Sequence, residues 1–320
     1  MIHRIGILTS GGDAPGMNPT VRAVVRAGLS AGKEVYYIYD GYRGLVEGNI
    51  VKADEQVVED IISRGGTVLR SARLPEFSDI KVREKGVEQL KKFGIDAIVV
   101  IGGDGSYKGA KALTKMGINC IGLPGTIDND IVSSDYTIGF DTALNTIVES
   151  TSHIADTMMS HSRAAVIEVM GHFCGDLSLY AAIATGADIL VTNERPLTEQ
   201  QIIEKLKEIK AKGKKSALIM VSEKIFDVDQ LAKKITEDGV FEARAAVLGH
   251  IQRGGIPTAA DRILGARLGV RAVDLLMEGK GGRCVGIHNN HIVDYEIDEA
   301  LSLPREDQSE LYDVVKKVNG

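Results

Sequence analysis

Short runs of apolar residues, rich in valine and isoleucine, alternate with segments of helical periodicity along almost the whole chain. Runs of this length and composition, bounded by glycines and polar residues, are typical of strands that are buried on both faces. We therefore expect strands at residues 5–9, 35–39, 97–101, 120–123, 164–169, 189–191, 217–221, 245–248 and 284–287.

Between many of these runs, apolar residues recur at the spacing of a helix. After the first run, such residues share one helix face; they are Val21, Val24, Val25 and Leu29. Similar patterns predict helices at residues 142–159, 198–212 and 258–278. Strands that alternate with helices favour parallel sheets, and this many strands suit two sheets better than one. The predicted fold class is α/β, with two doubly wound, mostly parallel sheet domains.

Composition narrows the class of protein. The chain has 320 residues, enough for two domains, and its 44% hydrophobic and 26% charged residues are those of an ordinary globular protein. The net charge of -6 argues against a nucleic-acid partner, which would require a basic surface. The three cysteines are distant in sequence, which favours a reducing compartment. With no signal segment or long apolar run, we expect a cytoplasmic protein without a membrane partner.

The first loop with candidate chemistry, residues 9–18, carries Gly11, Gly12 and Gly16 between a predicted strand and a predicted helix. Ligands bind at this edge of open α/β sheets, and helix N-termini favour negative charge. The loop could cradle an anion, although a plain strand-to-helix turn would have the same composition. It lacks the dinucleotide-binding glycine pattern, and the chain has no Walker A motif.

The second loop, residues 102–106, reads Gly-Gly-Asp-Gly-Ser and also follows a predicted strand. Its backbone could wrap phosphates, and Asp104 could reach a bound magnesium ion. The alternative interpretation is that Asp104 caps the following helix, as aspartate often does.

The third loop contains Thr126, Asp128 and Asp130. In an extended segment, the alternate spacing would place both carboxylates on one side. Asp128 could then accept a proton from a hydroxyl nucleophile while Asp130 orients the site. The same residues could form a solvated turn or a run of calcium ligands, but the twelve-residue calcium loop ending in glutamate is absent. Together, the second and third loops favour phosphoryl transfer.

Basic residues recur on different predicted elements, where they suit phosphate groups but could equally form surface ion pairs; they are Arg73, Arg163, Arg244, His250 and Arg253. Residues 249–255 are distinctive because glycines flank the cations and permit close approach of a ligand. The spacing of His288 and His291 is seen in zinc sites, but the neighbouring asparagines favour a loop. The lysine-rich residues 210–215 are typical of a solvated helix end and could also bind an anionic effector.

Taken in order, these loops resemble those of the bacterial ATP-dependent 6-phosphofructokinases. The similarity runs from Arg4 to Ile287 and is strongest at residues 8–18, 65–67, 100–106, 124–130, 139–145 and 249–255. The resemblance implies a homotetramer with the active site in the cleft between two domains. It implies a larger ATP-binding domain, residues 1–138 and 252–304, and a smaller fructose 6-phosphate-binding domain, residues 139–251 and 305–320.

The resemblance also implies roles for individual residues. The ATP set is Gly12, Arg73, Leu74, Gly103, Asp104, Gly105 and Ser106, with Asp104 as the residue that serves Mg2+. The catalytic set is Asp128, as the base for the 1-hydroxyl of the sugar, with Thr126, Asp130, Arg73 and His172. The sugar-phosphate set is Thr126, Ile127, Asp128, Met170, Gly171, His172, Glu223, His250, Ile251, Gln252 and Arg253. Arg163 and Arg244 would reach the sugar phosphate from the neighbouring subunit.

Two regions depart from the family pattern. His172 stands where arginine is usual, which puts one fixed charge at the transfer site in doubt. The expected effector set is Arg22, Arg26, Ala155, Gly186, Asp188, Lys212, Lys214, Lys215 and Ser216. In this set Ala155 replaces a usual arginine, Asp188 a usual glutamate and Ser216 a common histidine. We therefore expect only weak allosteric control by ADP or phosphoenolpyruvate.

The predicted activity is ATP-dependent phosphorylation of fructose 6-phosphate to fructose 1,6-bisphosphate, with Mg2+ as cofactor. The alternatives are a pyrophosphate-dependent phosphofructokinase, a lipid or NAD kinase of the Gly-Gly-Asp-Gly type, and a catalytically silent nucleotide sensor. Gly105 and Gly125 favour ATP over pyrophosphate because they leave room for the nucleotide. Asp128, Asp130 and the sugar-phosphate cations argue against the last two alternatives.

Overall fold

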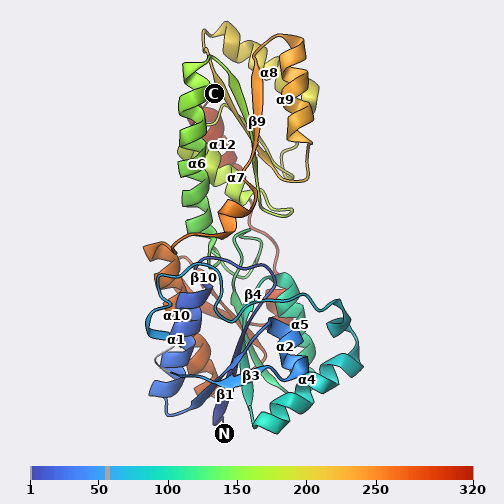
Figure 1. The fold of residues 1–320 in the computed structure, drawn as a ribbon, viewed down its shortest axis with the longest axis vertical. Helices are drawn as coiled ribbons and strands as arrows, with labels where there is room; N and C mark the ends of the chain where they lie inside the picture. The colour runs from blue at the N-terminus through green and yellow to red at the C-terminus, as the bar shows by residue number, and fades with distance from the viewer. Residues whose placement is uncertain (1, 55–57, 320) are drawn as a thin grey trace. The chain divides into compact units, whose positions relative to one another are not determined.

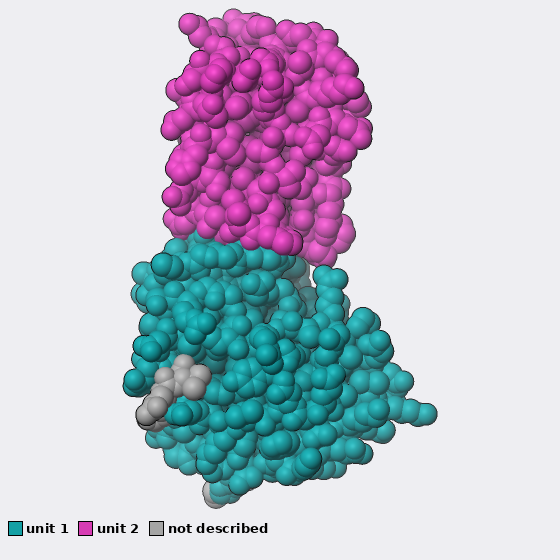
Figure 2. Space-filling model, viewed as in Figure 1, with its two compact units in different colours: residues 1–142, 253–305 teal, residues 143–252, 306–320 magenta. Residues whose placement is uncertain are grey.

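The computed structural model describes residues 2–54 and 58–319, and the chain divides into two compact units. Unit 1 comprises residues 1–142 and 253–305, and unit 2 comprises residues 143–252 and 306–320 (Figure 2). In the structure the boundaries between the units follow residues 142, 252 and 305. The resemblance implies boundaries after residues 138, 251 and 304, which are one to four residues earlier. Which ligand each unit binds stays a prediction.

Unit 1 contains a seven-stranded sheet in the order β11-β10-β5-β4-β1-β2-β3 (Figure 1). The inner strands are parallel, and β3 and β11 pair antiparallel at the two edges. The strands are β1 (Arg4–Ser10), β2 (Glu34–Ile38), β3 (Ile50–Lys52), β4 (Ala97–Gly102), β5 (Asn119–Pro124), β10 (Arg283–His288) and β11 (His291–Glu296). Every residue of β4 is buried, as expected of a continuous apolar run at the centre of a parallel sheet.

Helices cover both faces of this sheet. Buried residues of α2 (Gly41–Glu47), α4 (Ile80–Phe93) and α5 (Asp104–Thr114) join one hydrophobic cluster with the strands. On the other face, α1 (Met17–Ser30) packs against α10 (Ala259–Met277) (Figure 1). A Cβ at Gly269 would lie 2.8 Å from the Cβ of Ala23, so glycine is what allows α1 and α10 to pack this closely. Two short helices complete the unit, η1 (Pro75–Ser78) and α11 (Ile297–Ala300).

Unit 2 contains a four-stranded, fully parallel sheet in the order β7-β8-β6-β9. Its strands are β6 (Ala164–Val169), β7 (Ile189–Val191), β8 (Ala217–Ser222) and β9 (Ala243–Val247). Its core combines these strands with α8 (Glu199–Ala211) and α9 (Val228–Asp238). On the other side lie α7 (Asp176–Thr185), α12 (Ser309–Asn319) and the part of α6 (Phe140–Ser160) that belongs to this unit (Figure 1). The short helix η2 spans Gly249–Arg253.

The structure confirms the α/β fold with mostly parallel sheets and each predicted strand and helix, with small shifts at their ends. The largest strand shift is at β9, which spans Ala243–Val247 where we expected 245–248. The sequence interpretation missed β3 and β11. Asn289 and Asn290, expected in a loop, form the turn of the β10–β11 hairpin with φ of 49° and 63°. Among the described residues, no helix is both long and apolar enough to cross a membrane.

Candidate active site

The three predicted loops of unit 1 begin where neighbouring strands end. β5, β4 and β1 are adjacent and parallel, and residues 125–130, 103 and 11–16 follow their respective carboxyl ends. Carboxyl ends of parallel strands meet at one edge of a sheet, which is where open α/β sheets bind ligands. The structure therefore brings the three predicted loops together.

The first loop lies against a cation. A Cβ at Gly12 would be 2.5 Å from Nη1 of Arg253, which donates a hydrogen bond of 3.2 Å to the carbonyl of Asp13. The missing side chain at Gly12 thus makes room for the guanidinium beside the loop backbone. A cation at this place suits the binding of phosphate.

Arg73 and Leu74 belong to a segment that is tied to the first loop. Oγ of Ser71 donates a hydrogen bond of 2.6 Å to the carbonyl of Gly11. Arg73 is exposed, and its carbonyl accepts a hydrogen bond of 2.9 Å from Nη2 of Arg43. Leu74 packs half-buried against the hydrophobic core. The guanidinium of Arg73 is therefore the group of this segment that is available to a ligand.

The second loop leads into α5, whose N-terminus has no side-chain cap. Gly103, and not Asp104, occupies the N-cap position, so the alternative interpretation of Asp104 as the cap is wrong. The first N–H groups of a helix have no partner within the helix, which makes this end suitable for phosphate.

Side chains of the second loop differ in their access to a ligand. The Asp104 carboxylate is about half exposed and pairs with Lys108 at 2.6 Å. Gly105 is exposed, and a Cβ there would meet no atom within 4 Å. Ser106 is only 3% exposed, and its Oγ would lie 2.3 Å from a Cβ at Gly102. Asp104 and Gly105 therefore face open space, whereas the Ser106 hydroxyl lies under the loop.

The third loop is bent. The chain bends at Ile127 and Asp128, and Asn129 has a φ of 53°, so the expectation of an extended segment with alternating carboxylates is wrong. The bend brings Oγ1 of Thr126 within 3.3 Å of Oδ2 of Asp128, to which it donates, and within 3.2 Å of the Asp128 N–H, from which it accepts. The Thr126 hydroxyl therefore orients the Asp128 carboxylate.

Contacts beyond the loop fix this bend. Oδ1 of Asn129 accepts from the N–H of Thr137 at 2.9 Å, and Oγ1 of Thr137 donates to the carbonyl of Thr126 at 2.6 Å. Ile127 is fully buried, Asp128 is 9% exposed and Asp130 is half-buried. The arrangement holds the Asp128 carboxylate in one place at the rim of the protein interior, as a general base requires.

In unit 2, the loop after β6 is held by the carboxylate of Glu223. The N–H groups of Gly171 and His172 donate to Oε1 of Glu223 at 3.3 and 2.7 Å. Burial, followed by the nearby Glu223 carboxylate, raises the pKa of Glu168 on β6 above its usual value. Glu223 thus fixes the backbone of this loop through two hydrogen bonds, and it is also a predicted substrate residue.

Gln252 holds the same loop from inside. Its Oε1 accepts from the N–H of Met170 at 3.1 Å, and its Nε2 donates to the carbonyl of Gly249 at 3.0 Å. The side chain is fully buried, which makes Gln252 a support for the loop. Its neighbours His250 and Ile251 on η2 are exposed.

Phe173 and Lys224 were missed in the sequence interpretation. Nζ of Lys224 lies 4.5 Å from the ring centroid of Phe173, and the ring centroid of His172 lies 4.5 Å from it edge-on. His172 and Lys224 have φ of 58° and 69°, a region that non-glycine residues rarely adopt. In the sequence Phe173 follows His172 directly but lies 51 positions from Lys224, so no local pattern indicates this contact.

Arg163 and Arg244 lie far from this loop within unit 2. Arg163 directly precedes β6, whereas Met170 directly follows it, and Arg244 pairs in register with Ala165 near the start of β6. At about 3.3 Å per residue, the length of β6 separates the two groups by about 20 Å. The structure therefore does not bring the two arginines to the loop of the same unit.

The expected effector residues are dispersed over α1, α6 and the segments around β7 and β8. In unit 2, the side chain of Asp188 is 5% exposed, forms an ion pair with Lys214 and accepts a hydrogen bond of 2.9 Å from the N–H of Leu218. In unit 1, Arg26 pairs with Glu59 at 3.3 Å. Two of the expected phosphate-binding cations are thus engaged by carboxylates of the protein itself. The other members of the set are Arg22, Ala155, Gly186, Lys212, Lys215 and Ser216.

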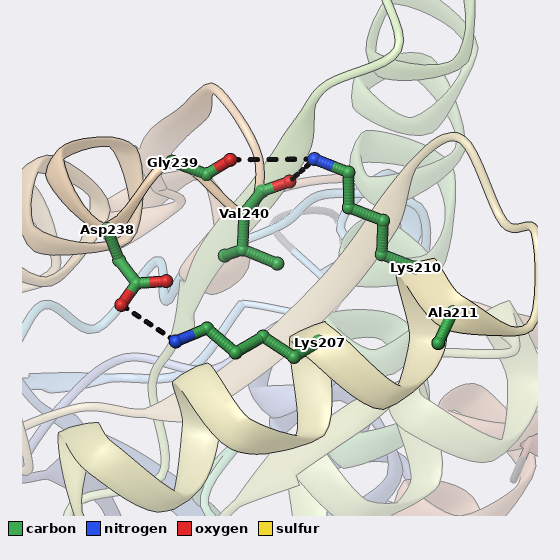
Figure 3. A pocket seen from close by; sticks show the side chains of 6 residues that line it. All are labelled: Lys207, Lys210, Ala211, Asp238, Gly239 and Val240. Atoms are coloured by element: carbon green, nitrogen blue, oxygen red, sulfur yellow. Dashed lines mark hydrogen bonds and ion pairs between the residues drawn. The ribbon is translucent and has the colours of Figure 1, made fainter.

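A separate hollow lies between the ends of α8 and α9 in unit 2 (Figure 3). Lys207 pairs with Asp238 at 2.9 Å, and Nζ of Lys210 donates to the carbonyls of Gly239 and Val240 at 3.5 and 2.5 Å. Lys210 thus binds the carbonyls that follow α9, and Lys207 binds the carboxylate of its last residue. Two residues of the lysine-rich run 210–215, Lys210 and Ala211, line the hollow, and no predicted active-site residue does.

Comparisons with known proteins identify the family. Residues 4–276 match the phosphofructokinase family. The ATP-dependent 6-phosphofructokinase of Vibrio cholerae is 54% identical over 319 residues, which is 99% of this chain and 100% of that protein. The enzyme of the same name from Edwardsiella ictaluri is 56% identical over 301 residues, 94% of each chain.

Solved structures show the same fold. The phosphofructokinase of Saccharomyces cerevisiae is 34% identical, with a TM-score of 0.86 over 99% of this chain and 47% of that chain. A pyrophosphate-dependent phosphofructokinase from Marinobacter aquaeolei superposes with a TM-score of 0.85 at 20% identity, over 100% of this chain and 92% of that chain, and supports the fold alone. The extent of the match and the identity over the full length show that the chain belongs to the phosphofructokinase family.

Proposed function

We propose that this protein transfers the γ-phosphoryl group of ATP to the 1-hydroxyl of fructose 6-phosphate, giving fructose 1,6-bisphosphate and ADP in glycolysis. The observation that carries the proposal is the Asp128 carboxylate, held by Thr126 beside the two glycine-rich loops. Full-length identity above one half to enzymes named ATP-dependent 6-phosphofructokinase supports ATP as the donor.

Unit 1 supplies the groups that bind the nucleotide and accept the proton. The backbone beside Gly12, Gly103 and Gly105 and the N-terminus of α5 bind phosphates through N–H groups. Asp128 accepts the proton of the attacking hydroxyl, and Thr126 keeps its carboxylate oriented. Phosphoryl transfer depends mostly on positioning and on stabilisation of negative charge, and Arg73 supplies a cation for the latter.

Mg2+ is proposed as the cofactor, with Asp104 as its protein ligand. Mg2+ in phosphoryl-transfer sites takes one or two carboxylates and completes its shell with water and substrate phosphates. One half-exposed carboxylate next to a phosphate-binding helix end fits this chemistry. When bound, the ion would neutralise charge on the transferred group.

Unit 2 supplies the groups that recognise the sugar phosphate. The loop of Met170, Gly171 and His172 is rigid because Gln252 and Glu223 hold its backbone. His172 offers an imidazole at the position where the resemblance implies a guanidinium.

We also propose a cytoplasmic homotetramer in which Arg163 and Arg244 complete the sugar-phosphate site of a neighbouring subunit. Their position about 20 Å from the Met170 loop of their own unit supports this assignment. Control by ADP or phosphoenolpyruvate is proposed to be weak, because Ala155 offers no charge and Asp188 already pairs with Lys214.

A coupled assay tests the proposed activity. Purified protein is supplied with ATP or pyrophosphate, with and without fructose 6-phosphate, and ADP or phosphate release is followed. Turnover is expected with ATP only when fructose 6-phosphate is present, and omission of Mg2+ is expected to abolish it. Comparable turnover with pyrophosphate, or ATP turnover with a lipid or NAD as the acceptor, would support an alternative.

A further inference from the structure

One carboxylate of unit 2 bridges two arginines. Oε2 of Glu242 lies 3.0 Å from Nε of Arg163, and its Oε1 lies 2.5 Å from Nη2 of Arg244. Each oxygen of the carboxylate thus has a guanidinium of its own. The contact with Arg163, and then the charges of both arginines, lower the pKa of Glu242, so the bridge persists in its ionised form at neutral pH.

Strand register brings these three residues together. Glu242 directly precedes β9, and its carbonyl accepts a hydrogen bond of 2.9 Å from the N–H of Ala164, the first residue of β6. Arg163 directly precedes Ala164, so it lies beside Glu242 on the neighbouring strand. Arg244 is two residues beyond Glu242, and alternate residues of a strand share one face. Backbone pairing therefore dictates the cluster.

Fold stability does not explain the bridge. All three side chains are partly exposed, with 27%, 43% and 57% of the Arg163, Glu242 and Arg244 side chains accessible. Ion pairs with this exposure contribute little to the stability of a fold. They do restrict two long side chains that would otherwise sample many rotamers, and that restriction lowers the entropy lost when an anion binds.

We propose that Glu242 is a positioning residue, which holds Arg163 and Arg244 side by side so that their remaining N–H groups receive one phosphate group. A guanidinium has five N–H donors, and the bridge occupies only one nitrogen of each arginine. The donors that remain can bind a dianionic phosphate in the forked geometry that suits arginine. The inference rests on the proposed function, in which this group is the 6-phosphate of the sugar.

The test is the variant Glu242→Gln, which keeps the shape and removes the charge. The KM for fructose 6-phosphate is expected to rise about three- to tenfold, because two arginines then lose their fixed orientation. The value of kcat and the KM for ATP are expected to stay within twofold of the wild type. An unchanged or lower KM for fructose 6-phosphate would overturn the inference. A fall in kcat with an unchanged KM would overturn it as well.

Glu278→Gln is the matched control. Glu278 also bridges two cations, Arg271 at 2.6 Å and Lys280 at 2.7 Å, but it lies in unit 1, directly after α10. Loss of this bridge is expected to leave the KM for fructose 6-phosphate unchanged. If both variants raised KM equally, Glu242 would have no special role in positioning.

Arg163→Ala separates the inference from the proposed function. If this variant leaves the KM unchanged, the assignment of Arg163 to the sugar phosphate fails. If Arg163→Ala raises KM and Glu242→Gln does not, the positioning role alone fails. In the double variant, Glu242→Gln is expected to add less than its effect in the wild type, because it acts through Arg163. Full additivity of the two effects would contradict the inference.

Discussion

Oγ1 of Thr142 donates a hydrogen bond of 2.5 Å to Oδ2 of Asp261, although the two residues are 119 positions apart in the sequence. The same carboxylate accepts hydrogen bonds from the N–H groups of Gly139 and Thr142 at 2.7 and 2.8 Å. Asp261, on α10, thus binds the start of α6. Asp261 is 1% exposed, and burial raises its pKa to about 6 in spite of these donors.

This raised pKa predicts a pH dependence of stability. Below about pH 4, Asp261 is protonated in both the folded and the unfolded chain. Between about pH 4 and pH 6 the unfolded chain loses the proton that the folded protein keeps, so the stabilising contribution of Asp261 declines as pH rises. The total decline is about 3 kcal/mol. Chemical denaturation at several pH values measures it as a fall in the free energy of unfolding.

Asp261→Asn removes this titration, and the slope of stability against pH is the quantity to compare. The variant is expected to be less stable than the wild type, because an amide cannot accept all three hydrogen bonds. Its free energy of unfolding is nevertheless expected to change less between pH 4 and pH 6. Asp274→Asn, at an exposed position on the same helix, serves as the control. Parallel pH profiles for the wild type and Asp261→Asn would refute the assignment.

Replacement of Asp128 by serine is expected to lower kcat by about 10²- to 10⁴-fold, the usual contribution of a general base. Binding of fructose 6-phosphate is expected to remain largely intact, since the proposed role of Asp128 is to accept a proton. Steady-state kinetics and calorimetric titration with the sugar phosphate measure the two effects. Asp156→Ser, at an exposed position on α6, is the control. Near-native turnover of Asp128→Ser would rule out the role.

Hybrid oligomers test whether subunits share a site. Arg163 precedes β6 and Met170 follows it, so one chain would contribute the two residues to different sites. Inactive Asp128→Ser and inactive Arg163→Ala proteins, mixed by dissociation and reassembly, are expected to regain part of the activity. In a symmetric oligomer some sites would then carry neither defect. No recovery in oligomers shown to be mixed would argue that each subunit works alone.

The Asp188–Lys214 pair supports the expectation of weak allosteric control. An effector phosphate must compete with a nearly buried carboxylate for this lysine, and Ala155 provides no second contact. A bidentate arginine contact is worth roughly 1.5–3 kcal/mol. Ala155→Arg is therefore expected to lower, about ten- to hundredfold, the concentration of phosphoenolpyruvate that shifts the fructose 6-phosphate saturation curve. Saturation curves with fructose 6-phosphate at several phosphoenolpyruvate concentrations provide the measurement. A strong wild-type response at micromolar phosphoenolpyruvate, with no gain in the variant, would contradict this expectation.

Strands with two neighbours in a sheet were recognised from continuous apolar runs. Every residue of β4 and nearly every residue of β6 is buried, so hydrophobic composition alone identified both. β3 and β11 are edge strands with mixed exposure, and their apolar pattern is too weak to recognise. The shifted strand β9 also lies at the edge of its sheet, although β7, at the other edge, was predicted with its exact bounds.

The sequence by itself determined the alternation of strands and helices, the glycine-rich loops at the strand ends and the residue types for phosphoryl transfer. These follow from local composition and spacing. Only the tertiary structure decided that Thr126 orients Asp128 in a bent loop, that Arg253 lies against Gly12 and that Glu242 joins Arg163 to Arg244. Such contacts depend on strand register, on buried turns and on residues as far apart as Asp13 and Arg253, 240 positions from each other. The free energy that selects them comes from packing of the whole unit, which no local pattern contains.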